Sequence, residues 1–214
     1  GVVRTQMTSG FSDLALSPDG RKIAFIARGD VFAASAKDGG NAQRLTSTPG
    51  IESNPVWAPD NKRVAYTSER DGGTHIYAYD LSKNAEAALT GGAGRIDTSP
   101  VWSPDGKSIA WLRDGKKLMI MDVESKSERE VASSYFRLPP MEPPRAATWS
   151  PDSKWLAYGA TGTRLFFNVG LVPAAGGTTI PASFLPNTYG GSIVWSPDGK
   201  YVLYSSAQRT EPGR

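Results

Sequence analysis

Cysteine is missing from this chain of 214 residues, and histidine occurs once, at His75. Without cysteine the protein forms no disulfide and no thiolate metal site, and one histidine cannot build a multi-histidine metal centre. A nucleophilic serine usually requires a histidine base held in place by a third group. His75 begins an expected strand beside a glycine-rich turn. We therefore expect it to be structural or on the surface, and we expect no catalytic residue, metal or cofactor in this chain.

Long apolar runs and clusters of positive charge are also missing. No stretch reaches the roughly 18 apolar residues that a membrane-spanning helix needs. The 24 basic and 21 acidic residues leave a net charge of only +3, and basic residues form no run. The glycine-rich segment 91–94 precedes an expected strand, so it is not followed by a helix whose N-terminus could bind a phosphate. We therefore expect no membrane span and no nucleic-acid or nucleotide partner.

The sequence is rich in turn-forming residues, with 23 glycines and 16 prolines, and many of them belong to one repeated motif. A Pro-Asp pair recurs five times at intervals of 41 to 47 residues, with prolines Pro18, Pro59, Pro104, Pro151 and Pro197. Seven residues after each proline stands an aromatic residue: Phe25, Tyr66, Trp111, Tyr158 and Tyr204. A period of this length indicates a repeat architecture in which each copy is one supersecondary unit.

The motif Ser-Pro-Asp-Gly predicts a tight turn between two strands. Proline presets the backbone for the second position of a type I turn, and serine suits the first position. The glycine then takes the left-handed conformation that closes a hairpin with a bulge. Asn61 and Ser153 replace this glycine in the second and fourth copies. Because serine adopts that conformation poorly, we expect the fourth turn to be the most distorted.

The strand after each turn is continuously apolar, as in Ile23–Ile26 and Ile109–Trp111, which indicates burial on both faces. Four strands in about 45 residues form the unit of a propeller blade. The sequence therefore predicts an all-β fold, a single β-propeller domain of four-stranded antiparallel blades. The blades are expected at about residues 11–46, 52–90, 97–133 and 145–184, with a partial fifth made by the two termini, 192–214 and 2–8. Since the fifth lacks its third strand, we expect the chain to be a piece of a longer propeller.

The motifs resemble those of TolB-like and tricorn protease-like propellers. Residues 52–79, which include Ser-Glu-Arg-Asp-Gly at 68–72, and residues 97–111 carry the resemblance best, whereas the first copy departs from it with Leu16 in place of tryptophan. Segments 172–177, 183–185 and 208–213 resemble the amino-terminal propeller of bacterial tricorn-like serine peptidases. That resemblance implies a non-catalytic module in a periplasmic or secreted protein, which binds or gates peptide or protein substrates for a carboxy-terminal catalytic domain. The alternative it implies is a TolB-like envelope scaffold that binds a protein partner through its channel or face.

Candidate binding residues lie where the chain enters the first strand of each repeat, because the innermost strands of a propeller line its central channel. The repeat register places Phe11, Glu52, Asp97, Pro144 and Gly190 in equivalent positions. We predict a polar channel mouth that recognises peptide ends or charged side chains, formed by Asp13, Glu52, Asp97 and Arg145. In the alternative interpretation, Glu52 and Asp97 hold the loops of the neighbouring blade. The proline-rich segment 136–144 is either a long loop or a stiff contact surface for a partner.

Overall fold

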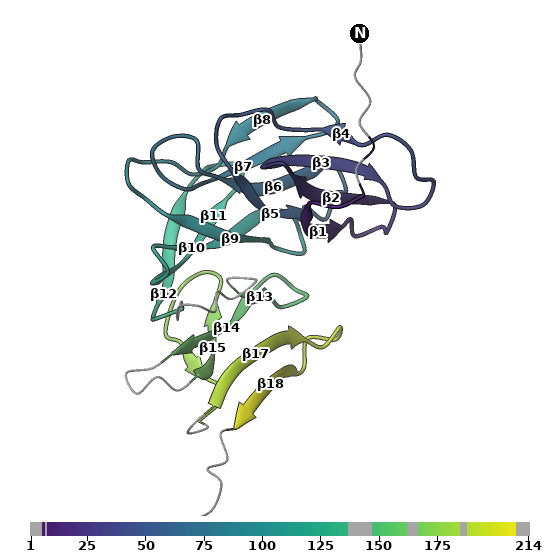
Figure 1. Cartoon of the computed structure of the whole chain (residues 1–214). Coiled ribbons are helices and arrows are strands. Elements are labelled where there is room, and N and C mark those ends of the chain that lie inside the picture. The colour runs from purple at the N-terminus through teal and green to yellow at the C-terminus, as the bar shows by residue number, and fades with distance from the viewer. Residues whose placement is uncertain (1–5, 7, 137–146, 162–166, 185–187, 209–214) are drawn as a thin grey trace, which may run out of the picture.

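The structure is a computed structural model that describes residues 6, 8–136, 147–161, 167–184 and 188–208. All regular secondary structure in these residues is β-strand (Figure 1). The first sheet contains β1 (Phe11–Leu16), β2 (Lys22–Ala27), β3 (Asp30–Ser35) and β4 (Gln43–Arg44), in that spatial order. The second contains β5 (Glu52–Trp57), β6 (Arg63–Ser68), β7 (His75–Asp80) and β8 (Ala85–Ala88).

The third and fourth sheets repeat this antiparallel arrangement, and a smaller fifth sheet follows. The third contains β9 (Asp97–Trp102), β10 (Ser108–Arg113), β11 (Lys117–Asp122) and β12 (Glu128–Ser133). The fourth contains β13 (Thr148–Trp149), β14 (Trp155–Thr161), β15 (Phe167–Pro173) and β16 (Ile180–Pro181). The fifth pairs β17 (Thr188–Trp195) with β18 (Val202–Gln208). The predicted fold, all-β with four-stranded antiparallel blades, is confirmed.

Apolar cores lie between successive sheets, which explains why the second strands are apolar on both faces. Ile26 and Val31 of the first sheet share a cluster with Trp57 and Tyr66 of the second. The next two interfaces contain equivalent clusters, one around Trp102 and Trp111 and the other around Trp149 and Tyr158. Each interior sheet is therefore stabilised by the sheet on either side of it, as in other repeat proteins.

The two ends of this row of sheets expose apolar side chains. Leu14 and Leu16 of β1 are 70% and 59% exposed, and Val194 and Leu203 of the last sheet are 52% and 57% exposed. Figure 1 shows the first sheet and the β17–β18 pair at opposite ends of the molecule. Of residues 2–8, expected to complete the fifth blade, only Gln6 and Thr8 belong to the described residues, and neither lies in a strand. That contribution and the single-domain organisation stay predictions.

All five Pro-Asp turns close with the same backbone hydrogen bond, and the expected distortion of the fourth turn is wrong. Ser153 takes a φ of 61°, close to the 69° of Gly106, and its N–H donates to Ser150 O at 2.9 Å. A side-chain contact accounts for this, because Ser153 Oγ accepts the backbone N–H of Asp105 in the preceding turn at 3.1 Å. In the second copy Asn61 Oδ1 accepts the N–H of Asp19 in the same way.

Replacing Ser153 with asparagine is expected to raise the free energy of unfolding by about 0.5–1 kcal/mol. Asparagine tolerates the left-handed conformation better than serine, and Asn61 shows that its side chain can still accept the neighbouring N–H. Urea denaturation measures the change. Ser153→Ala is the control, since it keeps the strained backbone, removes the acceptor and should lower stability. A lower stability for Ser153→Asn would contradict the comparison with Asn61.

Candidate functional site

The inner strands of the first three sheets each contain a β-bulge that re-aims the backbone. Asp13, Asn54 and Ser99 occupy equivalent positions in β1, β5 and β9, with φ values of 51°, 51° and 57°. Bulges of this kind turn side chains away from the regular alternation of a strand. Asp13 is exposed, and its Oδ2 accepts the backbone N–H of Asn54 at 2.9 Å. The first predicted site residue thus links two neighbouring inner strands while remaining open to solvent.

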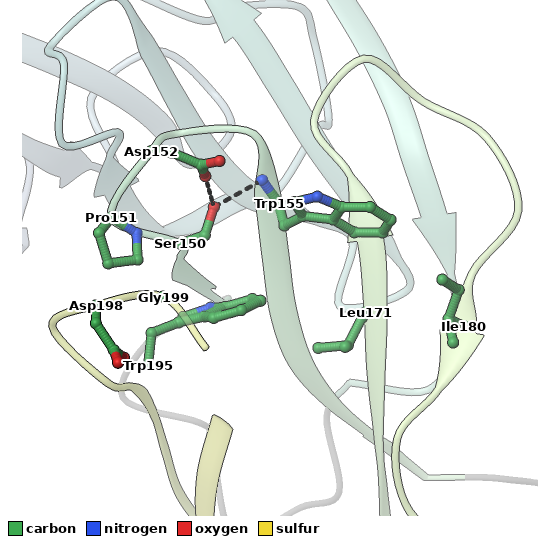
Figure 2. A pocket seen from close by; sticks show the side chains of 9 residues that line it. All are labelled: Ser150, Pro151, Asp152, Trp155, Leu171, Ile180, Trp195, Asp198 and Gly199. Carbon is green, nitrogen blue, oxygen red and sulfur yellow. Dashed lines mark hydrogen bonds between the residues drawn. The ribbon is translucent and has the colours of Figure 1, made fainter. Parts of the chain in front are cut away.

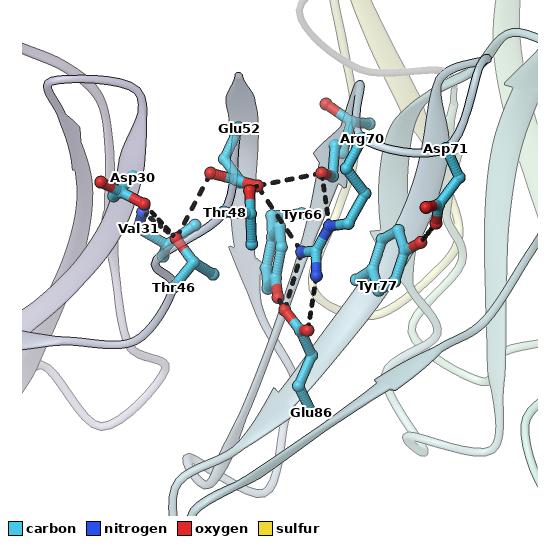
Figure 3. Close-up of polar contacts among 12 residues, drawn as sticks. Asp30, Val31, Thr46, Thr48, Glu52, Tyr66, Arg70, Asp71, Tyr77 and Glu86 are labelled. Carbon is cyan, nitrogen blue, oxygen red and sulfur yellow. Dashed lines mark hydrogen bonds and ion pairs between the residues drawn. The ribbon is translucent and has the colours of Figure 1, made fainter. Parts of the chain in front are cut away.

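Glu52 is buried between the first and second sheets, with 1% of its surface exposed. Its Oε1 accepts a hydrogen bond from Thr48 Oγ1 at 2.7 Å (Figure 3). The same oxygen also accepts from Ser68 Oγ at 2.9 Å. Its Oε2 accepts from Thr46 Oγ1 at 3.4 Å, and its backbone N–H donates to Gly29 O at 2.9 Å. Glu52 therefore joins the last loop of one sheet to the first strands of the next.

Arg70 supplies the charge that balances Glu52 and also binds the outer strand. Its Nη2 lies 3.5 Å from Glu52 Oε1, and its two terminal nitrogens bind both oxygens of Glu86 at 2.6 and 2.8 Å (Figure 3). The guanidinium centre also lies 3.9 Å from the ring centroid of Tyr77. Burial, followed by the charge of Glu52, raises the pKa of Glu86 above its usual value. This arginine couples an inner-strand carboxylate to the rim of the blade.

Tyrosine hydroxyls complete this cluster. Tyr66 donates to Glu86, and Tyr77 donates to Asp71 in the segment that follows β6 (Figure 3). Burial, and then the hydrogen bond to Asp71, raise the pKa of Tyr77 above its ordinary value of 10.0. The Tyr77 hydroxyl therefore stays protonated at neutral pH and acts as a donor to the Asp71 carboxylate.

Asp97 occupies the equivalent position in the third sheet and is completely buried. Its two oxygens accept hydrogen bonds from Arg113 Nε at 2.8 Å and Nη2 at 3.0 Å. Arg113 also binds Glu128 Oε2 on the outer strand at 2.9 Å. The hydrogen bond with Asp97 is the largest cause that raises the pKa of Arg113 above its ordinary value. Fork-like pairing of this kind fixes both the position and the orientation of the carboxylate.

The structure thus brings Asp13 and Glu52 to one end of the inner strands but holds Glu52 and Asp97 inside ion-pair networks. The Glu52 carboxylate binds Thr46 and Thr48 of the loop before it, whereas the Asp97 carboxylate binds Arg113 of its own sheet. The predicted channel mouth and its alternative both stay predictions. Arg145, the fourth candidate, and Pro144 lie outside the described residues. The sequence reasoning missed Arg70 and Arg113. The Ser-Glu-Arg-Asp-Gly segment at 68–72 and an arginine 16 residues after Asp97 were the available signals.

His75 begins β7 and is 2% exposed, which agrees with the structural role expected for it. Its Nδ1 has no hydrogen-bond partner among the described residues. No group of three or more histidine, aspartate or glutamate side chains in the described part of the chain is arranged to hold a metal ion. Within that same part, no helix is long and apolar enough to cross a membrane.

Repeated four-stranded antiparallel sheets with apolar interfaces between them are characteristic of the β-propeller class of repeat proteins. A family model described as the TolB beta propeller domain matches residues 6–164, which is more than half of the chain. The chain belongs to the TolB beta propeller domain family.

Curated relatives include both TolB and peptidases. The chain is 40% identical over 67 residues to the Tol-Pal system protein TolB of Desulfosudis oleivorans, covering 29% of this chain and 15% of that protein. It is 27% identical over 161 residues to the uncharacterized peptidase YuxL of Bacillus subtilis, covering 70% of this chain and 22% of that protein. It is 34% identical over 73 residues to tricorn protease homolog 1 of Streptomyces coelicolor, covering 34% and 7%. The matches therefore span less than a quarter of each of these relatives.

Solved structures share the fold. A TolB-type protein from Agrobacterium tumefaciens gives a TM-score of 0.69 at 20% identity, covering 92% of this chain and 70% of that one. The tricorn protease gives 0.72 at 18% identity, covering 92% and 19%. At these identities the likeness establishes the fold alone.

Proposed function

We propose that this chain is a non-catalytic β-propeller module of a tricorn-like serine peptidase, which binds or gates peptide or protein substrates. The observation that carries the proposal is that the ring nitrogen Nδ1 of His75 has no hydrogen-bond partner among the described residues. A serine peptidase triad needs an orienting group on histidine Nδ1, and in the described residues this atom of the buried His75 has no partner. The similarity to the peptidase YuxL over 70% of the chain supports the peptidase context. Catalysis then belongs to a separate carboxy-terminal domain of the parent protein.

The proposed peptide-binding residues lie at the start of the inner strands. Asp13 is exposed there and offers a negative charge to a peptide amine or a basic side chain. Glu52 and Asp97 contribute by fixing the loops that shape this mouth, because their own oxygens are occupied by Ser68, Thr48 and Arg113. Arg145 remains the candidate for a peptide carboxylate.

A second candidate function is a TolB-like envelope scaffold that docks a protein partner through its channel or face. The local identities of 36–40% to TolB proteins over 51 to 78 residues favour it. Under both proposals the protein is periplasmic or secreted. The coding sequence after Arg214 separates them, because a peptidase domain there supports the first, and a stop within one or two further blades supports the second.

The peptide proposal is tested with labelled peptides and the purified chain. Fluorogenic peptides should show no hydrolysis, while fluorescence anisotropy should detect peptide binding that Asp13→Asn weakens at least threefold. Asparagine tolerates the left-handed backbone at this position and keeps an acceptor for Asn54 N–H. Asp38→Asn, an exposed change at a Ser35 contact after β3, is the matched control. Hydrolysis by this chain, or binding that ignores Asp13, would overturn the proposal.

A further inference from the structure

A pocket of about 420 Å³ lies between the fourth and fifth sheets, at the turn end of the inner strands. Since Glu52 and Asp97 begin their strands and the Pro-Asp turns follow them, this pocket is at the opposite end from the proposed peptide mouth. Figure 2 shows the indole rings of Trp155 and Trp195 along the pocket, with Asp152 and Asp198 at one end. Leu171 and Ile180 line the other end.

The repeats show what occupies the equivalent place at the first two sheet interfaces. Lys22 Nζ lies 5.9 Å from the ring centroid of Trp57 and donates to Asn61 O at 3.3 Å. Arg63 Cζ lies 4.7 Å from the ring centroid of Trp102, and its Nη2 donates to Gly106 O at 3.4 Å. At both interfaces a cation from one sheet covers the tryptophan of the next and binds the carbonyl oxygen of the last residue in the turn that follows this tryptophan.

The fourth sheet lacks this cation. The residue that corresponds to Lys22 and Arg63 in the repeat is Trp155, and the tryptophan that it faces is Trp195. Trp195 is only half-buried, whereas Trp57 and Trp102 are 7% exposed. Among the described residues, no donor reaches the carbonyl oxygen of Gly199, which corresponds to Asn61 and Gly106. An aromatic face and a carbonyl acceptor are therefore both left open. The third interface differs again, with Ser108 at this position.

Negative charge at the pocket favours a cation there. Asp152 uses Oδ1 to accept hydrogen bonds from Ser150 Oγ at 2.6 Å and from Lys154 N at 3.1 Å, and neither bond involves its Oδ2. Asp198 is held in the same way by Ser196 and Lys200 N, and Lys200 Nζ lies 3.8 Å from its Oδ2. Hydrogen bonds from these serines are the largest cause that lowers the pKa of each aspartate, so both are ionised at neutral pH.

We propose that this pocket binds the guanidinium group of an arginine side chain presented by another polypeptide. The group stacks on Trp195 and Trp155, donates to Gly199 O as Arg63 does to Gly106 O, and faces Asp152 and Asp198. Guanidinium is favoured over ammonium because it is planar, stacks on aromatic faces and is more weakly hydrated. The aliphatic part of the arginine side chain contacts Leu171 and Ile180.

The test uses the full chain and two small probes, Nα-acetyl-arginine amide and the isosteric, neutral Nα-acetyl-citrulline amide. We expect the arginine probe to shift the indole N–H resonances of Trp155 and Trp195 in ¹H–¹⁵N spectra, with a Kd in the millimolar range. The citrulline probe should bind at least fivefold more weakly. A short alanine-flanked arginine peptide should bind more tightly than the amide, since the proposed source is a polypeptide. Equal shifts with both probes, or none with arginine, would overturn the proposal.

Three variants test whether the arginine probe binds in this pocket. Trp155→Arg recreates the internal cation seen at Lys22 and Arg63, and should weaken binding at least tenfold by occupying the site. Ser108→Arg makes the same change at the equivalent position of the third sheet and should leave the affinity unchanged. Asp198→Asn keeps the side-chain oxygen that accepts hydrogen bonds in the turn. It should weaken binding about threefold and reduce the salt dependence of binding. This variant tests the proposal even if Trp155→Arg unfolds the chain. If neither single variant, Asp198→Asn nor Trp155→Arg, changes the affinity, the arginine probe does not bind in this pocket.

Discussion

Replacing Asp97 with alanine is expected to lower the free energy of unfolding by about 3 kcal/mol. The change removes both oxygens that bind Arg113 and leaves the guanidinium, whose side chain is only 10% exposed, with Glu128 as its ion-pair partner and the Trp111 ring as its aromatic neighbour. Breaking a buried ion pair by deleting one member costs about 3–5 kcal/mol, and Glu128 moves the expected value to the lower end of that range. Urea denaturation followed by tryptophan fluorescence measures the loss.

Two further variants isolate the cause. Glu130→Ala breaks the exposed pair with Lys117, whose side chains are 40% and 49% exposed, and should cost less than about 1 kcal/mol. The double replacement Asp97→Leu and Arg113→Met removes both charges and should recover most of the stability, because apolar residues often replace a buried pair without loss. If Asp97→Ala costs under about 1 kcal/mol, the carboxylate is not held for stability, and a direct role in ligand binding becomes the better account.

The repeat and its turns could be predicted from the sequence because their causes are local. Proline at the second turn position and a residue with positive φ at the end fix each hairpin within five residues, and Ser17 and Gly20 form the expected bonds. The continuous apolar strands required a neighbour on both faces, and the cores around Trp57 and Trp102 supply it. Only the effect of Ser153 was misjudged, since its compensating bond comes from Asp105 in another blade.

The location of the candidate site residues could be predicted from the sequence, but the hydrogen-bond donors that surround their side chains could not. Repeat register placed Glu52 and Asp97 at equivalent points, yet whether a carboxylate faces a channel or the interior depends on donors from other strands. Arg113 reaches Asp97 across the sheet, and Thr48 reaches Glu52 from the preceding loop. The spacing of residues in the sequence does not show which side chains from other strands or loops contact a given carboxylate. The pocket beside Trp155 was missed for a related reason, because its meaning depends on comparing it with Lys22 above Trp57 in space.

Replacing Trp149 with alanine is expected to lower the free energy of unfolding by about 3–5 kcal/mol. Its ring is 6% exposed in the core between the third and fourth sheets, and its Nε1 donates to Val101 O at 3.2 Å. The loss combines the transfer free energy of the indole with the cavity it leaves. Trp155→Ala, on the half-buried ring of the same sheet, is the control for tryptophan removal and should cost clearly less.

Phenylalanine variants then separate the hydrogen bond from the packing. Trp149→Phe removes the hydrogen bond that Nε1 donates to Val101 O, whereas Trp102 Nε1 is buried with no partner in the described residues. A phenyl ring at residue 102 also keeps a face for Arg63. Trp149→Phe should therefore cost about 1 kcal/mol more than Trp102→Phe.

The position of Trp149 in the row of sheets makes its removal informative about cooperativity. In a repeat array each unit contacts only its neighbours, so weakening one interface uncouples the sheets on either side of it. Hydrogen exchange of Trp149→Ala should show faster exchange in β14 and β15 than in β6 and β10, whereas we expect these four strands to exchange together in the wild-type protein. Uniform acceleration across all four strands would instead mean that the sheets unfold as one unit and that no single interface governs the order of opening.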